Sequence, residues 1–203
     1  MRRLSILTAT LLLASLNTIG LKAQSRFDAS VFAGLNMAQI DGDGAGRFNQ
    51  PGLRAGVGTS LDLGSAWRPV LELAYTQKGS YIDEYNRSLK AGYVELVAMM
   101  SYNCLDNRLR LAAGVAPAVL VHARVTNGEE LDQPSTDNFT RFDWVPVTLS
   151  ARYLMGKHLG LELRWQNSML SDTKENASGT YRIFRSNKGC FHRLVTFGLS
   201  YTF

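Results

Sequence analysis

Apolar and polar residues alternate one by one from residue 195 onward in the last segment of the chain, residues 189–203. One parity carries Val195, Phe197, Leu199, Tyr201 and Phe203, and the other carries threonine, glycine and serine. A period of two predicts a β-strand with one apolar face. Such a strand at the edge of a soluble sheet invites aggregation, whereas a strand that closes a membrane barrel leaves no edge free.

The same alternation predicts seven earlier strands, at 27–37, 51–63, 68–82, 90–102, 108–123, 140–154 and 158–170. The connections alternate in length. Short turns are expected at 64–67, 104–107 and 155–157, and longer loops at 40–50, 83–89, 126–139 and 171–188. An even number of strands with short turns on one rim predicts an all-β fold, an eight-stranded antiparallel up-and-down transmembrane β-barrel. Its short turns would face the periplasm and its longer loops the outside.

The two faces of these strands differ in charge. One face is aliphatic, and the other holds most of the charged residues together with many glycines and alanines. A soluble lipocalin-like barrel that binds a ligand would turn the aliphatic face inward, so composition leaves this alternative open. Small residues on the charged face favour the membrane barrel, because an eight-stranded interior has little room beside arginine and glutamate.

In the membrane barrel the charged side chains would pair inside the lumen, because an unpaired buried charge is costly. We expect a structural network in the lumen and no continuous pore. Its predicted members are Arg54, Asp62, Glu72, Glu95, Arg110, Arg152, Glu162 and Arg164. Strand direction places Asp62, Glu72, Arg110, Arg152 and Glu162 toward the periplasmic end.

The N-terminus has the pattern of a secretory signal peptide. Arg2 and Arg3 precede an apolar run that ends at Leu16, and a small residue, Ala23, precedes the expected cleavage point. The run is too short for a membrane helix, which needs about 20 residues. We therefore expect a cleaved signal at 1–23, a barrel domain at 24–203 and a location in the outer membrane of a Gram-negative cell. After cleavage the charge is nearly balanced, which argues against a nucleic-acid partner.

Several segments resemble the PorT-type outer membrane β-barrel family. They are Phe32-Ala-Gly-Leu-Asn36, Pro51-Gly-Leu-Arg-Ala-Gly-Val57, Leu71-Glu-Leu-Ala-Tyr-Thr-Gln-Lys-Gly79, Tyr93-Val-Glu-Leu96, Leu111-Ala-Ala-Gly-Val115 and Leu159-Gly-Leu-Glu-Leu-Arg-Trp165. The ending, with Phe197, Leu199, Tyr201 and Phe203, resembles the signal read by the outer-membrane assembly machinery. The resemblance implies a fold and a location more than an activity, although one namesake of the family takes part in protein secretion.

Three functions of barrel proteins differ in what they require of these residues. The first is a non-enzymatic barrel that contacts membrane lipid and lipopolysaccharide. It would either help to build the outer membrane surface or bind a protein partner through loops 126–139 and 171–188, in secretion or surface assembly. The second is a barrel enzyme acting on lipid or protein at the outer rim, but the three histidines, His122, His158 and His192, form no catalytic constellation by spacing. The third is a porin, which eight strands leave no room for. No cofactor, metal site or catalytic residue is predicted.

Overall fold

The computed structural model describes residues 26–41, 48–82, 87–127, 133–134, 140–170 and 191–203. The expected signal peptide, 1–23, lies outside the described residues, and so do most of the loops expected at 126–139 and 171–188. No helix in the described part of the chain is long and apolar enough to cross a membrane.

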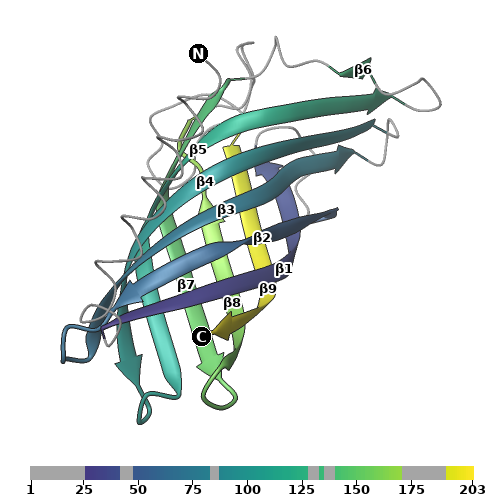
Figure 1. Ribbon diagram of the computed structural model, residues 1–203. Coiled ribbons are helices and arrows are strands. Elements are labelled where there is room, and N and C mark those ends of the chain that lie inside the picture. Colours follow the sequence, from purple (N-terminus) through teal and green to yellow (C-terminus); the bar gives the residue numbers. More distant parts are fainter. Residues whose placement is uncertain (1–25, 42–47, 83–86, 128–132, 135–139, 171–190) are drawn as a thin grey trace, which may run out of the picture.

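Eight long strands form a closed antiparallel barrel, as the sequence predicts (Figure 1). Their bounds are β1 Phe27–Asp41, β2 Gln50–Leu61, β3 Trp67–Ile82, β4 Arg87–Cys104, β5 Leu109–Asn127, β7 Phe142–Leu154, β8 Leu159–Asn167 and β9 Phe191–Thr202. Each strand pairs with its neighbour along the chain, and β9 pairs with β1 from Ser30↔Thr202 to Asp41↔Phe191. A short strand that the sequence did not predict, β6 (Gln133–Pro134), pairs with β5 beside Arg124 and Val125.

The two ends of the barrel differ in their connections. At one end, which we call the turn end, short turns join β2 to β3, β4 to β5 and β7 to β8, at the three predicted places. The β4–β5 turn holds Leu105, Asp106 and Asn107 in a left-handed conformation, with φ of 51°, 51° and 65°. The opposite end, the loop end, receives the longer connections.

Aliphatic side chains face outward and charged side chains face the lumen. Leu35 is 64% exposed and Leu199 51%, whereas Arg164 is completely buried. This is the reverse of a soluble barrel, whose apolar face would be inside. Val145 departs from the alternation of its strand. Alternation with Val147 and Leu149 would place it on the apolar outer face, but it is fully buried, because the β5–β7 register shifts between Gly114 and Ala116, opposite the segment that contains Pro146. Proline cannot donate to the ladder and is found at such irregularities.

Three strands rise higher than the others at the loop end. Pairing of β3 with β4 continues to Ile82↔Arg87, and pairing of β4 with β5 continues to Arg87↔Asn127. By contrast, the ladder between β8 and β9 ends at Asn167↔Arg193. We call the upper parts of these three strands, residues 77–82, 87–92 and 120–127, the tall wall. Figure 1 shows it projecting to one side, beyond the ends of β8 and β9. β4 therefore begins at Arg87, within the loop predicted at 83–89, and β5 continues to Asn127, past the predicted start of the loop at 126–139.

Candidate functional site

Five charged side chains form one network across the middle of the lumen. Glu72 of β3 accepts hydrogen bonds from Arg54 of β2 (2.8 Å), from Arg164 of β8 (2.7 and 3.0 Å) and from Arg152 of β7 (3.2 Å). Glu162 of β8 accepts from Arg152 at 2.6 Å and from Arg164 at 2.6 Å. Because β3 and β8 lie on opposite walls of the barrel, this network crosses the lumen.

A second cluster lies nearer the loop end and also joins distant strands. Lys78 of β3 is completely shielded and forms salt bridges with Glu95 of β4 (3.0 Å) and Asp143 of β7 (2.8 Å). Gln166 of β8 donates to Glu95 at 3.2 Å. The Lys78 ammonium also lies 4.7 Å from the centre of the Tyr93 ring, which favours a cation.

Aromatic and aliphatic side chains fill the space around these charges. The guanidinium of Arg54 lies over the Phe32 ring at 4.3 Å. Tyr93 packs with three alanines of β4 and β5 in one buried cluster, and Val97, Met99, Ala116 and Val145 form another. The bridges cross the lumen and these clusters fill part of it at several heights.

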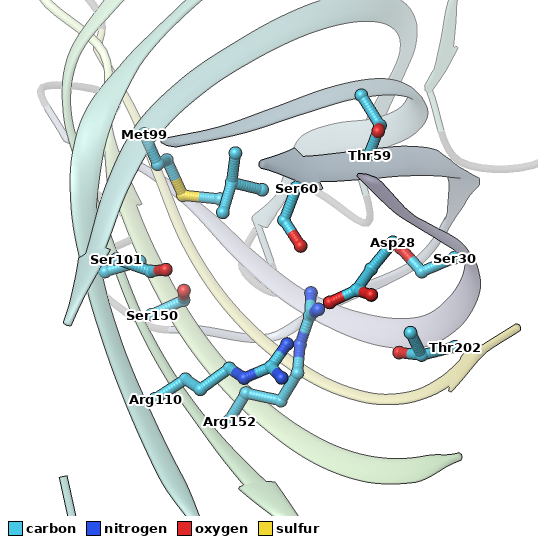
Figure 2. A pocket seen from close by; sticks show the side chains of 12 residues that line it. Asp28, Ser30, Thr59, Ser60, Met99, Ser101, Arg110, Ser150, Arg152 and Thr202 are labelled. Carbon is cyan, nitrogen blue, oxygen red and sulfur yellow. The ribbon is translucent and has the colours of Figure 1, made fainter. Parts of the chain in front are cut away.

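A third cluster and a small cavity lie at the turn end. Arg68 of β3 forms salt bridges with Asp28 of β1 (2.7 Å) and Asp62 (2.5 Å). Figure 2 shows Asp28, Arg110 and Arg152 pointing into the cavity beside this cluster. Its volume is about 20 Å³, which is room for about one water molecule rather than a ligand.

Arg110 differs from the other basic residues of the lumen. It stands directly opposite Arg152 in the β5–β7 register, and none of the described residues forms a salt bridge with it. It also lines an open recess of about 530 Å³ between the β4–β5 and β7–β8 turns, together with Arg68 and Asp106. Its guanidinium can therefore reach water, which lowers the cost of leaving it unpaired.

Seven of the eight predicted lumenal residues are thus divided among the three clusters. Glu72, Arg152 and Glu162 lie in one network with Arg54 and Arg164. Glu95 joins the cluster nearer the loop end, Asp62 pairs at the turn-end mouth and Arg110 lies alone. The expected set omitted Asp28, Arg68, Lys78 and Asp143. Alternation places Lys78 on the polar face of its strand, so the sequence indicated that it faces the lumen. Asp143 lies beyond the irregularity at Pro146, and alternation there does not show which face it occupies.

Among the side chains that the structure describes, the charges placed in these clusters and at Arg110 are equal in number. The six basic side chains are Arg54, Arg68, Lys78, Arg110, Arg152 and Arg164, and the six acidic ones are Asp28, Asp62, Glu72, Glu95, Asp143 and Glu162.

Aromatic side chains surround the outside of the turn end. Trp67 and Tyr102 are paired across β3 and β4 with ring centres 4.9 Å apart. Tyr201 of the closing strand packs against His158 at 5.4 Å and against Phe203 at 5.3 Å. Phe203 is 71% exposed, so the end of the chain presents an aromatic side chain to its surroundings. A ring of aromatics at this level is typical of a membrane interface.

At the loop end, Ser168 contacts Asp143 through its side chain and His192 through the backbone. The Ser168 hydroxyl donates to Asp143, and the Ser168 amide donates to the His192 carbonyl. Since Asp143 is also the partner of Lys78, its carboxylate is engaged in the ion network. His158 lies at the other end, where its Nδ1 is 2.7 Å from the Thr202 carbonyl oxygen.

A closed eight-stranded barrel with an aliphatic outer surface, an aromatic ring at one rim and paired charges inside is a transmembrane β-barrel. The family called outer membrane protein beta-barrel domain matches residues 22–170. The chain belongs to this family and is an outer membrane protein. The turn end therefore faces the periplasm and the loop end faces outward.

Two solved structures illustrate the likeness in fold. Neisserial surface protein A is 11% identical, with a TM-score of 0.51 over 87% of this chain and 97% of that one. Ail, the attachment invasion locus protein of Yersinia pestis, was solved in complex with the heparin analogue sucrose octasulfate. It is 11% identical, with a TM-score of 0.52 over 88% of this chain and 99% of that one. No curated protein matches the chain in sequence.

Proposed function

We propose that this protein is a non-enzymatic, non-conducting barrel that acts through a binding surface at its outer end. The observation that carries the proposal is the lumen, which salt bridges cross at two heights, between Arg164 and Glu72 and between Lys78 and Asp143. Transport through such an interior would require these buried pairs to separate. The tall wall, in contrast, extends an ordered sheet beyond the neighbouring strands, where a partner has access.

The surface comprises the tall wall and the loops expected at 126–139 and 171–188. Its occupant is proposed to be a protein partner in secretion or surface assembly, which the PorT-type resemblance supports. The chain would reach the outer membrane after removal of the signal peptide at 1–23, and the exposed aromatic ending would serve the assembly machinery. An enzymatic role is disfavoured because the Ser168 hydroxyl donates to Asp143, an acid that already pairs with Lys78.

Two measurements test the proposal. In planar bilayers the purified protein is expected to give no steady ion conductance, and a stable conductance would contradict the filled lumen. On intact cells, a photo-cross-linking residue in place of Arg124, which is exposed on the tall wall, is expected to capture a protein partner. The matched control replaces Arg108, which is exposed at the turn end. Equal products from both positions, or none from the tall wall, would contradict a partner at the outer end.

A further inference from the structure

A row of polar side chains interrupts the aliphatic outer surface at the base of the tall wall. Tyr75 and Gln77 of β3 face outward, continuing the parity of Leu71 and Leu73. His122 of β5 lies beside them, with its Nε2 3.4 Å from the Tyr75 hydroxyl and its ring stacked on the tyrosine at 6.1 Å. These side chains lie outside the barrel, so the lumenal charge network does not account for them.

A β-bulge turns His122 outward. Gly92 of β4 pairs with His122 whereas the next residue, Tyr93, pairs with Leu120, so Val121 is the extra residue. Without the bulge, alternation from Ala116 and Ala118 would place His122 in the lumen. With it, His122 is exposed and Ala123 is buried. Bulges that re-aim a side chain are frequent next to functional sites.

Gly92 provides the room for this arrangement. A Cβ atom at Gly92 would lie 2.3 Å from Cε1 of His122 and 2.6 Å from the Tyr75 hydroxyl. The two rings therefore meet over a strand position without a side chain, and a side chain there would displace them. Gln77 fixes the tyrosine, because its amide donates to the Tyr75 hydroxyl (3.3 Å) while its own carbonyl accepts from the Leu53 amide (3.0 Å).

The row lies at the depth of lipid headgroups. Trp67, in the aromatic ring at the turn end, and Gln77 are ten residues apart on β3. At about 3.3 Å per residue and a tilt of about 40°, this separation is about 25 Å along the barrel axis. The apolar band of an outer membrane barrel is about 25 Å tall, so the row coincides with its outer boundary.

The charge next to the row is positive. Lys90 lies one outward position above Gly92 and is exposed, and Arg124 stands opposite it in the β4–β5 register. We propose that Tyr75, Gln77, Lys90 and His122 bind the phosphorylated headgroup of a glycolipid in the outer leaflet. Lys90 and the imidazole suit a phosphate. The neutral hydroxyl and amide beside an aromatic face suit the sugar that carries it.

This site goes beyond the proposed function, since it needs only the location and orientation of the barrel and not a protein partner. The full mature chain would be folded into nanodiscs of phosphatidylcholine with a small fraction of lipid A, and native mass spectrometry would count the lipid A molecules retained. His122→Phe keeps an aromatic ring against Tyr75 but removes the nitrogens, and Lys90→Gln removes the charge. Each is expected to weaken lipid A retention about tenfold, as the loss of one charge-assisted hydrogen bond predicts.

The chain offers a matched control at the other rim, where His158 is stacked on Tyr201 with rings 5.4 Å apart. His158→Phe is expected to leave retention unchanged. Wild type is expected to retain dephosphorylated lipid A no better than His122→Phe does. The same result is expected when phosphatidylglycerol replaces lipid A. Unchanged retention in both His122→Phe and Lys90→Gln would overturn the proposal and make the row part of an interfacial girdle only. Equal retention of dephosphorylated lipid A, or of phosphatidylglycerol, would overturn the phosphorylated glycolipid as its ligand. Conductance and partner cross-linking do not depend on these outcomes.

Discussion

Glu72 on β3 and Arg164 on β8 lie on opposite walls of the barrel and are joined across the lumen by a salt bridge of 2.7 Å. Both side chains are removed from water, and each has further partners in the same network. Removing one member of such a network leaves buried charges that no solvent compensates. The network is therefore expected to stabilise the barrel only as an intact set.

Arg164→Gln is expected to lower the free energy of unfolding by about 3–5 kcal/mol, because Glu72 and Glu162 both lose a buried partner. Urea unfolding in lipid vesicles would measure the change. Arg110→Gln is the matched control. It removes the same charge from the same polar face, but no described residue forms a salt bridge with Arg110, and we expect a loss below about 1 kcal/mol. Similar losses in the two variants would contradict the network.

Lys78→Met is expected to be strongly destabilising, since Glu95 and Asp143 then share a buried site without a cation. We expect a loss of about 3–5 kcal/mol. Replacing the two acids as well, with Glu95→Gln and Asp143→Asn, should restore part of that stability because neutral groups cost less to bury. The same unfolding assay applies. A triple variant less stable than Lys78→Met alone would show that the carboxylates contribute through other contacts.

Gly56→Ala is expected to disturb the lumen from the wall. A Cβ atom there would lie 2.2 Å from the Leu73 carbonyl oxygen and 2.7 Å from the edge of the Phe32 ring, which lies under Arg54. Overpacking of this kind costs about 1–3 kcal/mol. The neighbouring outward residue permits the reverse change as a control, because Ala55→Gly adds no atoms and should cost about 0.5–1 kcal/mol. A Gly56→Ala variant as stable as wild type would mean that β2 and β3 can move apart at this position at little cost in free energy.

Phe203→Ala is expected to reduce the amount of protein in the outer membrane without a matching loss of stability after refolding. The side chain is exposed and touches Tyr201 only at its edge, so little packing is lost. Immunoblots of membrane fractions and unfolding of refolded protein would separate the two effects. Phe27→Ala, which removes another exposed aromatic from the same rim, should leave the membrane level unchanged. If both variants accumulate like wild type, the ending is not an assembly signal.

Alternation of apolar and polar residues was sufficient to predict the eight long strands, the barrel and most of the lumenal charges. It failed where one residue interrupts the ladder. Pro146 reverses the parity of Val145 and Asp143, and the bulge at Val121 turns His122 outward, although the parity of Ala116 and Ala118 would place it inside. A periodic pattern does not show where such an extra residue lies. On either side of it, the side chains are chemically compatible with facing the lumen or the outside.

Partner choice inside the lumen was also beyond the sequence. The pairs Lys78–Asp143 and Arg164–Glu72 join strands that are not neighbours, and their distances depend on the tilt and stagger of the closed barrel. Alternation identified which side chains face inward, but the stagger decides which of them meet. This is why Arg110, expected in the network, is instead left at the turn-end recess.

The pairing of the last strand with the first has a consequence for biogenesis. Thr202 pairs with Ser30, and Thr196 donates to the Asn36 side chain at 2.6 Å, so the seam joins the two extremes of the barrel sequence. None of these contacts can form until the final residues have been synthesised and exported. Until β9 pairs with β1, the edges of these two strands and the aliphatic surface beside them have no closing partner.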